Sequence, residues 1–241
     1  MNKTKVFAVR IGDKYGQDVE NYIESKISNV TWIRDELPDV KLQWNKLRVM
    51  NMDIDEPVLV IDIDMLFMND YVKAIDYPIK KGEFLTAKSW WKDTWNENYS
   101  LCGGFQKYYP KDCKYIYDEF MSNIDYWSQY YITRKITIGP VNGEQYFVED
   151  QVKNRLKLKY LPETWMSRMC NKNDLEELAL INSQYPGEYV YLDGFHNDIK
   201  IIHFKDYEID YSFSSGYSSA SLSASTSGVS SSPSPSLRIS E

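Results

Sequence analysis

The stretch EPVLVIDIDMLFM, residues 56–68, is an apolar run interrupted by two aspartates, Asp62 and Asp64. Its first apolar part, residues 58–61, is too short for a soluble helix with one polar face, and it lies between Pro57 and the aspartates. This pattern predicts a strand that is buried on both faces. Two carboxylates that follow such a strand lie where open α/β sheets bind their ligands.

The spacing of the two aspartates suits a metal ion. In an alternating D-x-D segment both side chains point the same way, so Asp62 and Asp64 are able to reach one hard cation. Acidic residues at a strand end are also common as solvated side chains, and the motif alone does not separate the two interpretations. The apolar residues on either side favour a functional pair.

The composition limits the classes of function. The 241 residues are enough for one large domain with a sizeable core. The net charge of −7 and the lack of a basic stripe argue against nucleic acid as a partner. With no signal peptide and no apolar run near 18 residues, the sequence predicts no membrane span. The three cysteines lack C-x-x-C spacing and leave one unpaired, which suits a reducing compartment.

The segments before the aspartates alternate between strand and helix patterns. Strands are predicted over 5–11 and 30–34, and apolar residues recur at helical spacing over 15–27. A second helix is predicted over 42–52, which has few helix breakers. The order strand–helix–strand–helix–strand indicates a single α/β domain with a doubly wound, mostly parallel central sheet and helices on both faces.

The last thirty residues, 212–241, differ from the rest of the chain. Half of them are serine, two are proline, and almost none is charged. Such a segment lacks the apolar side chains that folding would bury, so we expect a disordered tail. The folded domain then spans residues 1–211.

The segment after a predicted strand over 83–87 is rich in aromatic residues. SWWKDTWNENYS, residues 89–100, holds three tryptophans without a steady period, which indicates a loop that packs on its own rings or closes over a ligand. Gly103 and Gly104 follow, just before the strand-like FQKYY. Paired glycines allow a close approach of the backbone to another group, although a tight turn would need them equally.

Further candidate residues occur late in the domain. A helix is predicted over 143–156, where Glu149 and Asp150 lie beside an apolar stripe; an acidic pair on a helix is commonly a solvated face. His203 lies in the apolar segment KIIHFK, with Lys205 two residues later. A histidine in such surroundings is commonly a core residue, yet an imidazole and two carboxylates form a workable ligand set for Mn²⁺ or a similar ion.

The order of these features resembles that of GT-A-fold glycosyltransferases. Both have the same features in the same order: a strand with D-x-D, a Gly-Gly segment, an acidic-glutamine motif, and a late histidine with a lysine two residues later. The chain is also similar to the small glycosyltransferase domains of chloroviruses, the large algal viruses, over about residues 3–170. Five segments carry this similarity: VFAVRIGDKYG (6–16), KLQWNK (41–46), NMDIDEP (51–57), KYYPKDCKYIYD (107–118) and GPVNGEQYFVED (139–150).

The resemblance implies a site for a nucleotide-sugar donor. In such enzymes the first strand and its loop border the nucleotide base, and the matching residues here are Val9, Arg10 and Ile11. A basic residue on the helix before the acidic strand reaches the donor. Lys46 is the match, with Arg48 as a rival.

A metal site is implied by the same resemblance, with Mn²⁺ or Mg²⁺ as the cofactor. Asp62 and Asp64 correspond to the acidic motif that holds the donor ribose and the metal, and His203 matches the late metal ligand. Lys205 corresponds to a cation that faces the diphosphate. Relatives often have a glycine and another lysine after the late histidine, whereas FKDYEID follows here.

Sugar binding and catalysis are implied for two further segments. Gly103 and Gly104 are expected to line the sugar site, and Asp150 and Gln151 to lie beside the transferred sugar. The Asp-Gln pair after a Gly-Gly segment is closer to retaining enzymes, in which Asp150 would steady the sugar. In an inverting enzyme Asp150 or Glu149 would be the general base.

The function implied is a metal-dependent, retaining glycosyltransferase that moves glucose or rhamnose from a UDP-sugar to a glycan acceptor. The expected setting is synthesis of the glycan on a viral capsid glycoprotein in the host cytoplasm. A haloacid-dehalogenase-like phosphatase, which also uses D-x-D after an apolar strand, is an alternative. There, however, the pair follows the first strand, and Thr or Val stands where Leu66 is here. A sugar-binding module without catalysis is a third possibility, although the intact Asp/Asp/His set argues against it.

Overall fold

The computed structural model describes residues 4–68, 70–89, 98–137, 142–171, 189–191 and 198–204. The strands are β1 (Lys5–Val9), β2 (Val30–Ile33), β3 (Val58–Ile61), β4 (Met65–Phe67), β5 (Glu83–Lys88), β6 (Leu101–Tyr108), β7 (Lys157–Tyr160), β8 (Met166–Asn171), β9 (Tyr189–Tyr191) and β10 (Ile201–Phe204). The helices are α1 (Gln17–Lys26), α2 (Val72–Ile75), α3 (Pro110–Ser122), α4 (Ile124–Thr133), α5 (Glu144–Arg155) and the 3-10 helices η1 (Leu42–Asn51) and η3 (Glu163–Trp165). None of the helices in these ranges is both long and apolar enough to cross a membrane.

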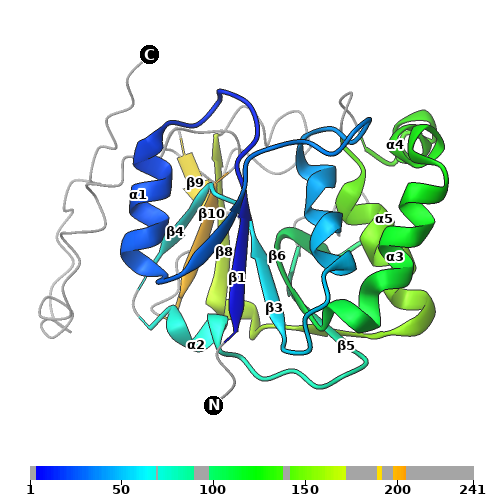
Figure 1. Ribbon diagram of the computed structural model, residues 1–241. Helices are drawn as coiled ribbons and strands as arrows, with labels where there is room; N and C mark the ends of the chain where they lie inside the picture. The colour runs from blue at the N-terminus through cyan, green and yellow to red at the C-terminus, as the bar shows by residue number, and fades with distance from the viewer. Residues whose placement is uncertain are drawn as a thin grey trace, which may run out of the picture.

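A six-stranded central sheet has the order β2-β1-β3-β6-β5-β7 (Figure 1). β1 pairs in parallel with β2 and β3, and β5 pairs in parallel with β7. β6 runs antiparallel to both of its neighbours, β3 and β5. The predicted α/β fold with a mostly parallel sheet is therefore confirmed.

Each face of the central sheet has its own hydrophobic core. On β3, Leu59 and Ile61 face a core shared with α1, α2 and the second sheet. Val58 and Val60 face the opposite core, which is built with η1, α3, α4 and α5. Figure 1 shows α1 on one side of the sheet and α3 to α5 on the other. Because β3 is covered on both sides, all four of its side chains are fully buried, as its apolar run predicted.

The stretch 56–68 contributes to both sheets of the protein. β3 ends at Ile61 and β4 begins at Met65, so Asp62 and Asp64 lie in the link between them. β4 belongs to a four-stranded sheet with the order β4-β10-β8-β9, in which Met65 pairs with His203 of β10. This second sheet brings the late histidine strand beside the two aspartates.

The helix predicted over 42–52 is present in a 3-10 form, whereas the predicted position of the paired glycines was wrong. The segment predicted as a helix over 42–52 is the 3-10 helix η1, in which Trp44, Leu47 and Met50 are fully buried. Their spacing of three residues aligns them on one side of a 3-10 helix, so core packing favours this form. Gly103 and Gly104 lie inside β6 rather than before it.

Several predicted features lie outside the described residues. They are the tail over 212–241, Lys205 and residues 90–97 of the aromatic loop. The division into a domain over 1–211 and a tail therefore stays a prediction.

An ion-pair cluster joins the ends of β1 and β2 to α1. Arg10, which follows β1, places Nη1 2.7 Å from Glu20 Oε1, and Arg34, which follows β2, places Nη2 2.8 Å from Glu20 Oε2. The Glu20 side chain is only 2% exposed. The hydrogen bond from Arg34 is the largest influence on this carboxyl and, with the bond from Arg10, outweighs burial and lowers the pKa of Glu20 to about 2.

Replacement of Glu20 by glutamine is expected to reduce stability in a pH-dependent way. Because the folded-state pKa is lowered from 4.5 to about 2, the contribution of the carboxylate is present above pH 4.5 and is lost as the pH falls toward 2. At neutral pH, Glu20→Gln should lower the free energy of unfolding by about 1–3 kcal/mol. Denaturant unfolding of both proteins should show this difference shrinking progressively below pH 4.5.

A control for this experiment is Asp118→Asn, which breaks the exposed pair with Lys114. Exposed pairs contribute little, so this variant should unfold like the unmodified protein. A Glu20→Gln difference that stays constant down to about pH 2.5 would contradict the assignment.

Candidate active site

Asp62, Asp64 and His203 converge at the point where the two sheets meet. Among the described residues they form a group whose potential metal-ligating atoms all lie within 4.8 Å of one another. His203 Nε2 is 3.3 Å from Asp64 Oδ1 and 3.7 Å from Asp62 Oδ2. A backbone hydrogen bond of 2.9 Å from Phe204 N to Asp64 O fixes β10 beside the link that carries the aspartates.

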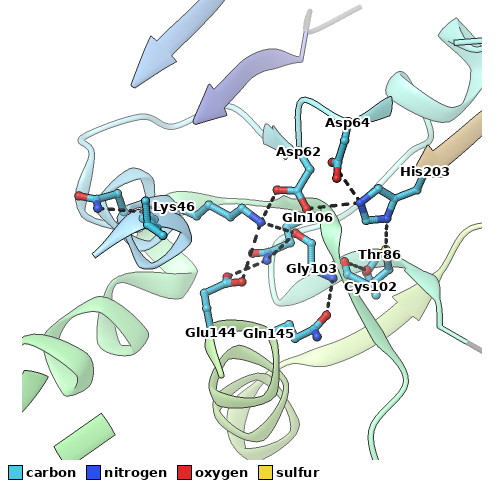
Figure 2. Close-up of polar contacts among 12 residues, drawn as sticks. Lys46, Asp62, Asp64, Thr86, Cys102, Gly103, Gln106, Glu144, Gln145 and His203 are labelled. Atoms are coloured by element: carbon cyan, nitrogen blue, oxygen red, sulfur yellow. Dashed lines mark hydrogen bonds and ion pairs between the residues drawn. The ribbon is translucent and has the colours of Figure 1, made fainter. Parts of the chain in front are cut away.

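Lys46 lies on the other side of Asp62 (Figure 2). Its Nζ is 2.5 Å from Asp62 Oδ1, 3.0 Å from the carbonyl oxygen of Gly103 and 4.0 Å from Glu144 Oε2. The side chain is only 4% exposed. Burial acts to lower the pKa of this ammonium, but the carboxylates of Asp62 and Glu144 outweigh burial, and the pKa is raised above its usual value. Lys46 therefore stays charged and holds Asp62 in place.

The charges of this cluster favour a cation. The carboxylates of Asp62 and Glu144 lie around the ammonium of Lys46, and Asp64 lies close enough to raise its pKa further. Three carboxylates and one ammonium leave these four residues with a net negative charge. Carboxylate oxygens with an imidazole nitrogen suit Mn²⁺, and the carboxylates alone suit Mg²⁺. The residues present thus fit the divalent ion that the resemblance implies.

Gly103 and Gly104 form an irregularity in β6. The register of β5 against β6 shifts between Thr86 and Lys88, which indicates a bulge in this part of the ladder. Bulges re-aim the backbone and are frequent beside active sites. Here the carbonyl of Gly103 turns toward the buried ammonium of Lys46.

The two glycines face opposite sides of the strand. A Cβ on Gly104 would lie 2.8 Å from His203 Cε1 and 3.1 Å from Asp62 Oδ2, whereas a Cβ on Gly103 would lie 3.0 Å from the Cβ of Gln145. Real Cβ atoms essentially never approach other atoms more closely than 3.0 Å. A side chain at 104 would therefore displace His203 or Asp62, whereas a side chain at 103 would press against Gln145 of α5.

Glu144 and Gln145, in the first turn of α5, were not among the residues predicted from the sequence. Gln145 Oε1 accepts a hydrogen bond of 3.2 Å from Gly103 N, and Glu144 Oε1 accepts one of 2.9 Å from Gln106 Nε2. A signal was available, because the chain contains two pairs of an acidic residue followed by glutamine, at 144–145 and at 150–151. The first pair stands at the start of the predicted helix, where side chains and backbone N–H groups face the ligand end of an α/β sheet.

Glu149 fixes the start of β6. Its side chain is 0% exposed, and its carboxylate accepts hydrogen bonds of 2.9 Å from Ser100 N and 2.7 Å from Leu101 N. Lys153 Nζ lies 2.8 Å from the same carboxylate. Gln145 and Glu149 are four residues apart and so lie on one face of α5. They bind N–H groups at 103 and 101, so α5 holds the bulged strand at two points.

Asp150 is bound by two tyrosines. Its Oδ2 accepts hydrogen bonds of 2.6 Å from the Tyr131 hydroxyl and 3.1 Å from the Tyr99 hydroxyl. Burial, reinforced by the Asp150 carboxylate, raises the pKa of both hydroxyls, so they remain donors. The contacts join α5 to α4 and to the segment before β6. Catalytic roles for Glu149 and Asp150 stay predictions.

The residues predicted near the nucleotide base lie at the end of β1. Val9 is the last residue of β1, and both Val9 and Ile11 are partly buried against the core that contains η1. The guanidinium of Arg10 is held by Glu20 and donates a 3.0 Å hydrogen bond to the carbonyl of Tyr15. A base at this edge would therefore meet backbone and apolar groups of 9–11.

Two other candidates make contacts outside the group around Asp62. Arg48, the rival of Lys46, donates a 3.0 Å hydrogen bond to the carbonyl of Asp35 at the surface. Gln151 is partly buried on α5, and its backbone carbonyl accepts a 2.7 Å hydrogen bond from the Tyr115 hydroxyl.

The fold matches solved glycosyltransferases, although the sequence matches no protein-family model and no curated protein. The galactosyltransferase LgtC, solved in complex with donor and acceptor sugar analogues, aligns with a TM-score of 0.51 and 11% identity over 87% of this chain and 91% of LgtC. The glycosyltransferase GlyE of Streptococcus pneumoniae TIGR4 aligns with a TM-score of 0.56 and 10% identity over 83% of this chain and 55% of GlyE.

A glycosyltransferase involved in the glycosylation of the major capsid of PBCV-1 aligns with a TM-score of 0.48 and 14% identity. This likeness is too weak to bear on the origin of the chain. The similarity to LgtC and GlyE shows a GT-A-like fold, as the resemblance implied, and the chain is structurally similar to glycosyltransferases of that fold.

Replacement of Gly104 by alanine should weaken metal binding, whereas replacement of Gly103 by alanine should not. Gly104→Ala places a methyl carbon against His203 and Asp62, so Mn²⁺ binding should weaken about tenfold or more. Gly103→Ala displaces Gln145 instead and should leave the affinity for Mn²⁺ within about twofold of the original. Titration calorimetry with MnCl₂ on both proteins, after thermal unfolding has confirmed that they fold, measures the difference. Equal losses of affinity would contradict the separation of the two faces.

Proposed function

We propose that this protein is a metal-dependent glycosyltransferase that transfers a sugar from a UDP-sugar to a glycan acceptor. The observation that carries the proposal is the convergence of Asp62, Asp64 and His203 beside the buried cation Lys46, in a GT-A-like fold. With a divalent cation bound, this arrangement would suit a negatively charged diphosphate. The fold also favours this activity over the phosphatase alternative.

The two aspartates and the histidine would hold the divalent cation, Mn²⁺ or Mg²⁺. When bound, such an ion neutralises as a Lewis acid the charge that develops on a diphosphate leaving group. Lys46 keeps one oxygen of Asp62 engaged, which orients the other oxygen toward His203. Preorganised charges of this kind need no rearrangement when the sugar–phosphate bond breaks.

We assign Gln145 to the position beside the transferred sugar. It lies at the first turn of α5, across the bulge from His203, and it is held by the backbone of Gly103. An active-site glutamine was replaced by glutamate in one structure of LgtC, so a glutamine belongs to the active site of that neighbour. Glu144 supports the site by accepting a hydrogen bond from Gln106 and by facing Lys46.

An amide beside the sugar favours retention of configuration. An amide side chain does not take up a proton near neutral pH, so Gln145 is unsuited to be the general base that inversion requires. In the retaining case the acceptor hydroxyl attacks on the side from which the diphosphate leaves, and a phosphate oxygen accepts its proton. The amide oxygen of Gln145 would then stabilise the positively charged sugar.

The finer substrate assignments rest on the resemblance to the chlorovirus domains. We propose UDP-glucose or a UDP-rhamnose as the donor and a glycan of a viral capsid glycoprotein as the acceptor. The first strand would contribute Val9, Arg10 and Ile11 to the base site. Lys205 is proposed as a further cation facing the diphosphate.

The metal site is tested by Asp64→Asn. Loss of one ligand leaves the diphosphate charge uncompensated, so UDP binding should lose its dependence on Mn²⁺ and weaken about tenfold or more. Titration calorimetry with UDP in Mn²⁺ and in chelator measures the effect. Asp53→Asn is the control, since Asp53 is 92% exposed and pairs with Lys111 at the surface. Equal binding of UDP by the unmodified protein in chelator and in Mn²⁺ would refute the metal site.

Catalysis is tested by comparing Gln145→Ala with Gln151→Ala. If Gln145 stabilises the sugar during transfer, its loss should lower the rate of UDP release from UDP-glucose about 100-fold while Mn²⁺ and UDP binding persist. Gln151→Ala should retain most of the rate. The reverse result would move the catalytic glutamine to the second acidic-glutamine pair.

The stereochemistry and the enzymatic nature of the site are tested together. NMR of the anomeric centre of the product should show the configuration of the donor. An inverted product would assign the chemistry to a carboxylate base. Binding of the donor without any turnover would identify a sugar-binding module.

A further inference from the structure

Cys102 lies behind His203, on the side of the imidazole away from the two aspartates (Figure 2). The thiol sulfur is 3.7 Å from His203 Nδ1, within hydrogen-bonding distance for sulfur. Both residues are buried, so the contact is shielded from solvent. Nε2 of the same ring faces Asp64 and Asp62.

Two residues of β6 lie along one edge of the imidazole ring. Cys102 and Gly104 are two residues apart on β6; the thiol faces Nδ1, and the missing side chain of Gly104 leaves room for Cε1. The ring edge Nδ1–Cε1–Nε2 therefore runs from the thiol, past the glycine, to the carboxylates. This geometry gives each ring nitrogen a polar neighbour.

Neutral imidazole has one N–H and one lone pair, and the two nitrogens exchange these roles between tautomers. A cation at Nε2 needs the lone pair there, so the proton is on Nδ1. When no cation is bound, Nε2–H is able to donate to Asp64, and Nδ1 then carries the lone pair. A neighbour of Nδ1 must accept a hydrogen bond in the first state and donate one in the second.

A thiol meets both requirements, since its sulfur accepts weakly and its S–H donates weakly. A backbone carbonyl or carboxylate, the usual partner of a metal-binding histidine, only accepts and so favours one tautomer. We propose that Cys102 is a positioning residue that partners Nδ1 of His203 in both tautomers and thereby supports cation binding. The inference rests on the metal site proposed above. Cys102 would support this site through His203 and would not itself bind the metal.

Three variants test the role by calorimetric titration with MnCl₂ alone. Cys102→Ala removes the thiol beside Nδ1 and should weaken Mn²⁺ binding about 3- to 10-fold. Loss of an outer-shell partner typically costs about 10- to 100-fold in metal affinity. A smaller loss is expected here because sulfur is a weak hydrogen-bond acceptor. Cys102→Ser keeps a group that both donates and accepts, and it should recover affinity to within about threefold. Cys113→Ala, which removes the buried thiol of α3, is the matched control and should bind Mn²⁺ like the unmodified protein.

The tautomer is read directly by NMR of protein labelled with ¹⁵N-histidine. The chain has two histidines, His196 and His203, so a His196→Gln sample assigns the rings. Long-range proton–nitrogen spectra should show His203 protonated on Nε2 without metal and on Nδ1 with saturating Zn²⁺, a diamagnetic ion that takes imidazole ligands. This measurement uses the unmodified Cys102 and therefore does not depend on whether Cys102→Ala folds.

The outcomes separate this inference from the proposed function. Unchanged Mn²⁺ affinity in a folded Cys102→Ala protein, or a single tautomer with and without Zn²⁺, would overturn the role of Cys102 and leave the metal site standing. An unmodified protein that binds neither Mn²⁺ nor Mg²⁺ would overturn both.

Discussion

The contact between Lys46 and Asp62 is the interaction on which the rest of the site depends. A buried ammonium is costly unless it is paired, and here Asp62 and Glu144 provide the compensating charge. Removing one partner of such a buried pair typically costs about 3–5 kcal/mol, because the other charge is left unpaired. Asp62 also lies beside Asp64 and His203, so the same carboxylate joins the stability of the core to the candidate site.

The site exists because two sheets meet at one short link. β3 ends where both of its faces are covered, and the chain passes through Asp62 and Asp64 before entering β4 of the second sheet. Pairing of β4 with β10 then brings His203 to the same point. A single strand over 56–68 would have left the histidine without a fixed relation to the aspartates. The break between β3 and β4 is thus a requirement of the site.

The bulge in β6 lets side chains from both faces of the sheet approach the same backbone. On one face Gly104 makes room for the imidazole of His203, and on the other Gly103 makes room for Gln145. Because a bulge removes regular ladder bonds, its N–H groups need other acceptors. Gln145 and Glu149 supply these acceptors from one face of α5, which fixes the helix and the strand relative to each other.

The amino-acid sequence by itself determined the buried strand β3, the α/β order and the aspartate pair, because these follow from local apolar patterning. It also contained the imidazole and the two carboxylates, which together form a workable ligand set for a divalent cation. Only the tertiary structure decided that Gln145 binds the bulged strand and that Glu149 holds backbone N–H groups. The face and height at which a helix meets a sheet depend on packing between distant segments. The second sheet and the 3-10 form of η1 escaped prediction for the same reason, since both are imposed by long-range contacts.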